Sequence, residues 1–166
     1  IEVVQKAQIR RNGPAGGRAP DDPNRFEAGK RPFYTLNPGL ALADGRPRLV
    51  YGTQGADGQP QTLALLLTRL IDHGLDPLEA LRRPRFLLGR TFSDGRDTLK
   101  IEADVGADVL AELARRGHEL SPIAAASPLA GQAGVIRISA DGRLDGAHDP
   151  RGDGRAIGVE PRDEGA

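Results

Sequence analysis

The sequence predicts a mixed α/β fold of the α+β type, and three observations support this prediction. Apolar runs of strand length come first, helical periodicity follows, and further strand-like runs close the chain. Two turn signals join neighbouring strand-like runs, and one segment has a clear amphipathic pattern. This order is typical of sheets that are covered by helices, and it disfavours a helix bundle.

The first strands are predicted at residues 33–43 and 47–53, which Asp44-Gly45 joins into a hairpin. Both turn residues tolerate positive φ, as a tight turn between antiparallel strands requires. The remaining strands are expected at 84–89, 97–102, 118–123, 132–139 and 143–148, with Ala140-Asp141-Gly142 between the last two.

Residues 60–73 predict an amphipathic helix that ends at Gly74, because glycine readily adopts the left-handed conformation of a helix stop. Its spacing of i, i+3, i+4, i+7 and i+8 places five apolar side chains on one face. We expect this face to be buried; its members are Leu63, Leu66, Leu67, Leu70 and Ile71.

Two shorter helices are also predicted. Asp76 is a cap before a proline, so a second helix starts there, and it must end by Arg83 because Pro84 follows. A third helix is expected near residues 107–116, where Gly117 ends it, and its buried side consists of Val109, Leu110 and Leu113.

Composition excludes several classes of protein. The 166 residues suit one domain, and the 23 basic and 23 acidic residues cancel, which argues against a nucleic-acid or membrane-surface partner. Without cysteine, disulfides and thiolate metal sites are excluded. The histidines, His73, His118 and His148, form no ligand motif, so we expect no metal and no cofactor.

Both ends of the chain are predicted to lack regular structure. Residues 1–32 contain a run rich in glycine and proline at 11–20, which offers little to bury. The segment after Asp149 is charged and rich in glycine, and we expect it to be a surface tail.

The segment from Tyr51 to Gln61 predicts a strand, a loop with glycines at Gly52, Gly55 and Gly58, and a helix start. Free backbone N–H groups and the positive end of a helix dipole favour a bound anion or oxyanion there. From the loop alone, an ordinary strand-to-helix turn is the favoured interpretation. A nucleotide site is disfavoured, because the spacing is GxxGxxG and no Gly-Lys-Ser/Thr follows.

A second polar segment precedes the first predicted strand. It carries the hydroxyls of Tyr34 and Thr35 and the amide of Asn37. These groups can bind a polar substrate, but for this segment alone the favoured interpretation is that they satisfy neighbouring backbone groups.

Together these segments resemble the small subunit of the gamma-glutamyltransferase family. The resemblance is carried by Lys30-Arg31-Pro32, the loop at 52–58, Ala80 to Phe86, Arg115 to His118, and Asp149 to Gly154. It covers residues 21–159 in colinear order, and the sequence looks similar to a side branch with oxamate amidohydrolase-like enzymes. Residues 1–20 form an unmatched segment, and residues 160–166 form a tail.

The resemblance implies part of an N-terminal-nucleophile hydrolase, whose αββα sandwich is incomplete in this chain. In such enzymes a threonine that self-cleavage exposes attacks an amide, with its own amine as base. That threonine belongs upstream, so we expect the chain alone to be inactive. The implied partners are a small amide substrate, the large subunit and the missing N-terminal part of the small subunit, with neither nucleic acid nor a membrane.

The same resemblance implies the roles of five residues. Gly55 and Ala56 match the oxyanion glycine pair; Tyr34 and Thr35 match two substrate-binding serines, and Asn37 lies beside them. The phenol of Tyr34 weakens the expectation of γ-glutamyl specificity, and Ala56 suits its role only if its φ is not positive. The alternative function is a non-catalytic remnant that serves as a structural or binding module.

Overall fold

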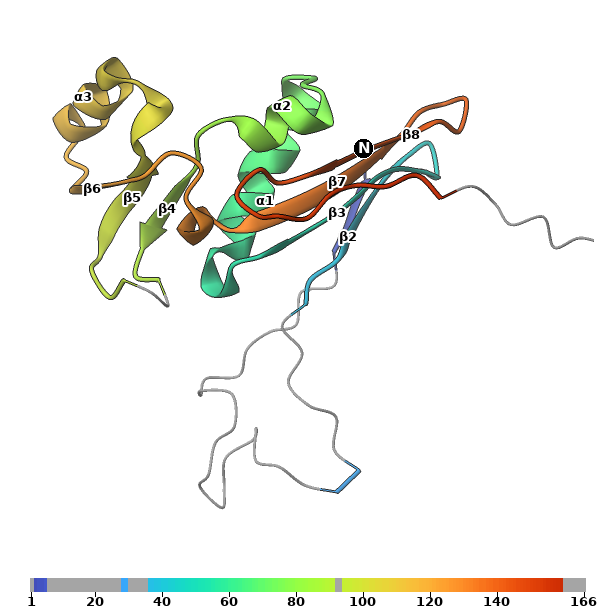
Figure 1. Ribbon diagram of the computed structural model, residues 1–166, viewed down its shortest axis with the longest axis horizontal. Coiled ribbons are helices and arrows are strands. Elements are labelled where there is room, and N and C mark those ends of the chain that lie inside the picture. Colours follow the sequence, from blue (N-terminus) through green and yellow to red (C-terminus); the bar gives the residue numbers. More distant parts are fainter. Residues whose placement is uncertain (1, 6–27, 30–35, 92–93, 160–166) are drawn as a thin grey trace, which may run out of the picture.

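The computed structural model describes residues 2–5, 28–29, 36–91 and 94–159, and it contains two sheets (Figure 1). The larger sheet has five strands in the order β1-β2-β3-β7-β8, all antiparallel to their neighbours. Its members are β1 (Glu2–Gln5), β2 (Gly39–Ala43), β3 (Arg46–Gln54), β7 (Gln132–Ile138) and β8 (Leu144–His148). The smaller sheet contains β4 (Phe86–Gly89), β5 (Thr98–Glu102) and β6 (Leu120–Ile123), with β5 and β6 parallel.

Three α-helices and several short turns connect these strands. Helix α1 (Gln59–Leu67) continues into a π-helical turn (η2, Thr68–Asp72), and α2 (Pro77–Arg82) follows. Helix α3 (Ala107–Arg115) lies beside the smaller sheet. In Figure 1, α1 lies between the two sheets. The 3₁₀ turns are η1 (Ala56–Gly58), η3 (Ala103–Val105) and η4 (Pro128–Ala130).

The predicted hairpin between β2 and β3 is confirmed. Asp44 and Gly45 have φ of 53° and 70°, and the register pairs Gly39 with Tyr51 at the opposite end of the two strands. This opposite end is the one from which β3 runs into the glycine loop. The hairpin therefore holds the start of β2 beside that loop.

The core lies between one face of the five-stranded sheet and helices α1 and α2. The predicted apolar stripe of the first helix is confirmed: three of its leucines are buried, and Leu67 and Ile71 are packed against the same cluster. The buried members are Ala41, Leu49, Tyr51, Ala133 and Val135 from the sheet, and Leu63, Leu66, Leu70, Ala80 and Leu81 from the helical layer.

Helix boundaries follow their predicted signals. Gly74 has a φ of 64° just after the π-helical turn. The Asp76 side chain accepts a hydrogen bond of 3.0 Å from the Glu79 N–H and so caps α2. The same helix ends at Arg82, in agreement with the proline two residues later.

The prediction of a buried face on the third helix is wrong. Val109 is 43% exposed, and no residue of α3 is fully buried in the described structure, although Leu110 and Leu113 are half-buried. Among the described elements, α3 makes its main contacts with the short strand β6 and with the η3 turn before the helix. A narrow sheet gives this amphipathic helix too little surface to cover its apolar side.

Two predictions about the chain ends also need correction. Residues 2–5 are not irregular but pair with β2; residues 6–27 lie outside the described part. The segment after β8 is not wholly on the surface, because Asp149 and Arg151 are 1% and 4% exposed. Exposed tail structure begins at Asp153.

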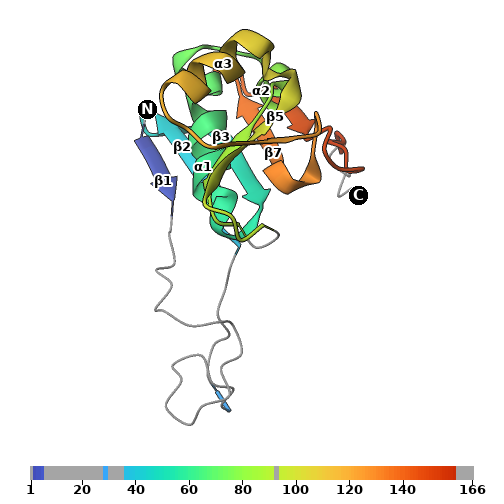
Figure 2. The same ribbon diagram turned by 90° about the vertical axis from the view of Figure 1, so that its left-hand side faces the viewer.

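The face of the five-stranded sheet that points away from the helices remains partly open. Val50, Ile136 and Leu144 are 41%, 40% and 66% exposed on this side. In Figure 2, where the left-hand side of Figure 1 faces the viewer, α1 and β5 overlie the strands of the larger sheet. One covered and one open face is the arrangement expected of an incomplete αββα sandwich.

Candidate functional site

The predicted strand, loop and helix start are confirmed at residues 51–61. Strand β3 ends at Gln54, Gly55 has a φ of 143°, and η1 leads directly into α1. The Gly58 N–H donates to the Gly55 carbonyl at 2.8 Å, which closes the turn. Only glycine adopts the backbone conformation of Gly55 without strain.

The loop leaves backbone donors available. Within the described part of the chain, neither the Gly55 N–H nor the Ala56 N–H donates to another backbone carbonyl. The first turn of the described helix α1 carries no acidic side chain, although Asp57 lies in the η1 turn just before it. These features are suited to binding a negatively charged oxygen.

Ala56 does not meet the condition set from the sequence, that its φ should not be positive. Its φ is 46°, in the left-handed region. The Cβ atom of an L-residue costs about 1–2 kcal/mol there. The position therefore favours glycine, and the alanine retains the N–H at the expense of local strain.

Asn37 lies just before β2, and its Oδ1 is buried without a hydrogen-bond partner among the described residues. Tyr51 is in the same situation: its Oη has no partner there, and burial raises the pKa of its phenol. A Cβ on Gly39 would overlap the Tyr51 ring, so the ring lies directly over that glycine. Tyr34 and Thr35 lie outside the described residues, and their roles remain predictions.

Gly131 lies against the glycine loop, at the start of β7. A Cβ on Gly131 would lie 2.9 Å from the Gln54 carbonyl oxygen, and a Cβ on Gly55 would lie 3.6 Å from the Gly131 Cα. Gly131 also has a φ of 82°. Any side chain at this position would push the glycine loop outward.

Four buried charges join the two sheets close to Gly131, and the sequence did not predict them as a group. Arg85 Nη1 lies 2.5 Å from Asp149 Oδ2, and Arg151 Nε donates to Glu102 Oε1 at 2.7 Å. The same Arg85 nitrogen donates to the Gly131 carbonyl at 3.3 Å. All four side chains are at most 4% exposed.

Backbone donors complete this charge cluster. Glu102 accepts from the N–H groups of Arg85 and Ser127 at 2.8 Å each, and Asp149 accepts from Ala133 N–H at 2.8 Å. Burial lowers the pKa of Arg85, while Glu102 and Asp149 outweigh burial at Arg151 and raise its pKa. The two cations and two anions balance in charge. Their contacts connect residues of both sheets and so help to fix the relative position of the sheets.

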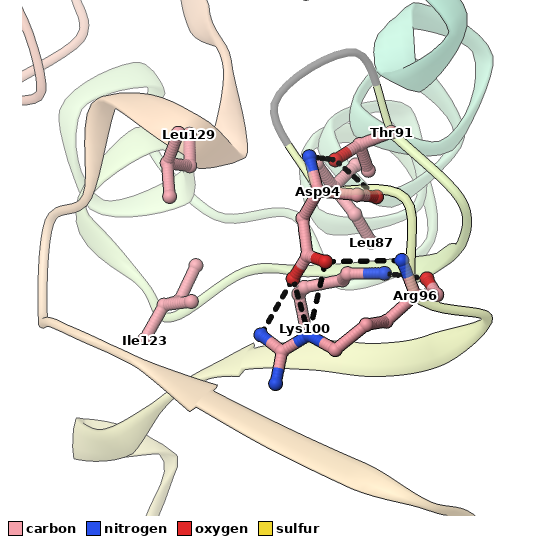
Figure 3. A pocket seen from close by; sticks show the side chains of 7 residues that line it. All are labelled: Leu87, Thr91, Asp94, Arg96, Lys100, Ile123 and Leu129. Atoms are coloured by element: carbon pink, nitrogen blue, oxygen red, sulfur yellow. Dashed lines mark hydrogen bonds and ion pairs between the residues drawn. The ribbon is translucent and has the colours of Figure 1, made fainter.

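A cavity of about 360 Å³ lies on the smaller sheet (Figure 3). Its polar groups already have partners: Asp94 pairs with Arg96 at 2.6 Å, and Lys100 Nζ donates to the carbonyls of Gly89 and Arg96. Figure 3 shows Ile123 and Leu129 across the cavity from these groups. The polar contacts tie the β4–β5 connection together, and no sequence motif had pointed to this cavity.

No metal-binding group of three or more histidine or acidic side chains occurs among the described residues. In the same part of the chain, the helices are too short or too polar to cross a membrane.

The family model described as gamma-glutamyltranspeptidase matches residues 5–159. The chain belongs to this family. The match starts before residue 21, where the sequence resemblance began, and it includes the glycine loop and all four buried charges. The likeness to amidohydrolases is also confirmed: the oxamate amidohydrolase proenzyme of Klebsiella pneumoniae subsp. pneumoniae is 47% identical over 131 residues.

Two further relatives have lower sequence identity to this chain. The glutathione hydrolase-like YwrD proenzyme of Bacillus subtilis is 39% identical over 136 residues, or 82% of this chain. The glutathione hydrolase proenzyme of Escherichia coli is 31% identical over 130 residues. The match to the Klebsiella protein covers 78% of this chain and 25% of that protein, so the chain spans about a quarter of such relatives.

Solved structures agree with this assignment. A cephalosporin acylase from Bacillus halodurans superimposes with a TM-score of 0.71 and 28% identity over 86% of this chain and 26% of that one. A gamma-glutamyltranspeptidase from Pseudomonas nitroreducens, complexed with L-DON, gives 0.65 and 27%, and covers 84% of this chain and 70% of that one. The fold is thus part of an N-terminal-nucleophile hydrolase, as the sequence predicted.

Proposed function

We propose that this chain is the C-terminal part of the small subunit of a gamma-glutamyltranspeptidase-family amide hydrolase. It supplies the oxyanion donors and one wall of the substrate pocket. The nucleophilic threonine comes from a segment upstream of these residues. The observation that carries the proposal is the pair of N–H groups at Gly55 and Ala56, which have no backbone acceptor in the described structure and lie at the start of the η1 turn that leads into α1.

The chemistry needs such donors. When the threonine hydroxyl attacks an amide carbon, the carbonyl oxygen becomes negatively charged, and two preorganised N–H groups stabilise it. Loss of one oxyanion donor lowers kcat by about 10²–10³ in other acyl-transfer enzymes. The strained Ala56 fulfils this role through its backbone, so its methyl group is not needed.

We propose a small amide as the substrate. Tyr34 stands where the γ-glutamyl enzymes resemble one another in carrying a serine, and a phenol there leaves less room for an α-carboxylate. The name of the 47%-identical relative, an oxamate amidohydrolase, supports this substrate class. The unpartnered Asn37 Oδ1 adds a buried acceptor that suits the N–H of such an amide.

The rest of the enzyme is the proposed partner. The open face of the five-stranded sheet and the half-covered helix α3 are apolar surfaces of the kind that a second sheet and further helices cover. The large subunit and the N-terminal part of the small subunit have this role in the proposal.

A chimaera tests the function. Residues 21–159 replace the aligned segment of the Klebsiella oxamate amidohydrolase, which keeps its own upstream half. We expect self-cleavage and oxamate hydrolysis, because the donors and the pocket wall are supplied by this chain. A chimaera that melts like its parent but hydrolyses no small amide would favour the alternative, a structural or binding module.

Substrate choice is tested in the same chimaera with Tyr34→Ser. The smaller hydroxyl should raise kcat/KM for γ-glutamyl anilide by roughly tenfold, because the α-carboxylate regains a hydrogen bond. The rate with oxamate should change little. If the ratio of the two rates is unaltered, Tyr34 does not determine specificity.

A further inference from the structure

The direction of the Gly55 N–H is set by the residue before it. The Gln54 carbonyl and the Gly55 N–H belong to one planar trans peptide, so they point in opposite directions. Any contact that fixes the Gln54 oxygen therefore fixes where the Gly55 N–H points.

A hydrogen bond holds that oxygen. Thr53 Oγ1 donates to the Gln54 carbonyl at 2.7 Å, and it also lies 3.1 Å from the Gln132 carbonyl on β7. A Cβ on Gly131 would lie 2.9 Å from the Gln54 oxygen and 3.2 Å from Thr53 Oγ1, so the glycine leaves room for this pair. The hydroxyl therefore favours one orientation of the Gln54–Gly55 peptide.

The hydroxyl also acts on the peptide electronically. A hydrogen bond to a carbonyl polarises its peptide group and strengthens the N–H at the other end as a donor. The contact with Gln54 is the shorter of the two that Thr53 makes, so most of this polarisation falls on the peptide that ends in Gly55.

We propose that Thr53 is a positioning residue, whose hydroxyl orients and polarises the Gln54–Gly55 peptide so that the Gly55 N–H serves as an oxyanion donor. This inference rests on the proposed function only in assigning the Gly55 N–H as an oxyanion donor. The orientation itself is a property of the chain. A purely structural Thr53 would tie β3 to β7 through Gln132 and leave the Gly55 amide unaffected.

The 166-residue chain, labelled with ¹⁵N and ¹³C, tests the proposal by NMR. In Thr53→Val we expect the Gly55 amide proton to move upfield by more than any amide outside residues 52–56. Thr53→Ser keeps the hydroxyl and should stay close to the wild type. Thr68→Val makes the same change on an exposed helical residue and serves as the control.

Titration with sodium acetate adds the link to function. Acetate should shift the Gly55 and Ala56 amides of the wild type and of Thr53→Ser, and Thr53→Val should bind it at least threefold more weakly. If acetate does not shift the Gly55 and Ala56 amides of the wild type, the proposed oxyanion role is contradicted. The Gly55 chemical shift in Thr53→Val still tests the positioning role of Thr53.

The proposal is overturned if Thr53→Val lowers the melting temperature without moving the Gly55 resonance. Should that variant not fold, the wild type alone decides the matter. A Thr53 hydroxyl proton protected from exchange, with a nuclear Overhauser contact to the Gly131 α-protons, supports the inference, and its absence refutes it.

Discussion

Two helices with similar apolar patterns, α1 and α3, are buried to different extents beside the two sheets. In the five-stranded sheet, the leucine stripe of α1 is buried against Leu49 and Tyr51, as its periodicity predicted. Beside the three-stranded sheet, α3 has an equally clear apolar stripe, but Val109 remains 43% exposed. Periodicity therefore predicts that an element is a helix, and it does not reveal whether the surface that covers the helix belongs to the same chain.

A buried charge cluster joins these two regions. Arg85 precedes β4 and Glu102 is the last residue of β5 in the smaller sheet, while Asp149 and Arg151 follow the last strand of the larger one. The hydrogen bonds among these side chains replace those that water would make. Removal of one side chain therefore leaves a buried charge poorly paired and destabilises the junction.

The largest expected effect is at this junction. Arg151→Met leaves Glu102 buried without its cation and Asp149 paired with Arg85 alone, and should reduce the free energy of unfolding by about 3–5 kcal/mol. Urea denaturation followed by circular dichroism measures it. The exposed Arg116→Met should change it by no more than about 0.5 kcal/mol. Equal losses in the two variants would show that the cluster does not hold the sheets together.

The next effect contrasts the two apolar stripes. Leu63→Ala opens a cavity in the core and should cost about 2–5 kcal/mol of unfolding free energy. Val109→Ala on the half-covered helix should cost less than about 1 kcal/mol, because little is buried there. A similar loss at both positions, again in urea, would mean that α3 is covered in solution.

A smaller, opposite effect is expected at the glycine loop. Ala56→Gly removes a left-handed strain of about 1–2 kcal/mol. The extra freedom of glycine in the unfolded chain offsets about 0.5–1 kcal/mol of this gain. The variant should therefore melt slightly higher than the wild type in calorimetry, and a lower melting temperature would indicate that φ at residue 56 is not positive.

The smallest expected effect is on the pH dependence of stability. The side-chain and backbone hydrogen bonds from Arg96 hold the pKa of Asp94 well below its usual 3.8. Since a lowered folded-state pKa stabilises the ionised form, this contribution is present above the unfolded pKa and is lost as the pH falls below it. Asp94→Asn should melt slightly lower than the wild type at pH 7, and the difference should shrink at pH 2.

Local signals predicted most of the fold. Asp44-Gly45 and Asp76 are turn and cap signals that act over a few residues, and each functions as expected. The charge cluster was not predictable in this way, because Arg85 and Arg151 are 66 residues apart and look like ordinary surface residues.

The candidate site was predicted in part. The position of the glycine loop followed from its sequence, and the structure supplied two facts that no pattern contained. These are the positive φ of Ala56 and the contact of Gly131 with the Gln54 carbonyl. The Gly131 contact depends on how β7 approaches β3 across more than 70 residues of sequence, so only three-dimensional structure reveals it.

The Tyr51 ring over Gly39 links two positions twelve residues apart into one steric unit. A methyl group at residue 39 would occupy the space of the ring, so an alanine there is compatible only with a small side chain at residue 51. The two positions should therefore vary together among homologues, with an aromatic residue at 51 accompanied by glycine at 39. A library randomised at both sites and selected for folding would recover the pair Gly39–Tyr51 and pairs with two smaller residues, and few combinations in which both are large.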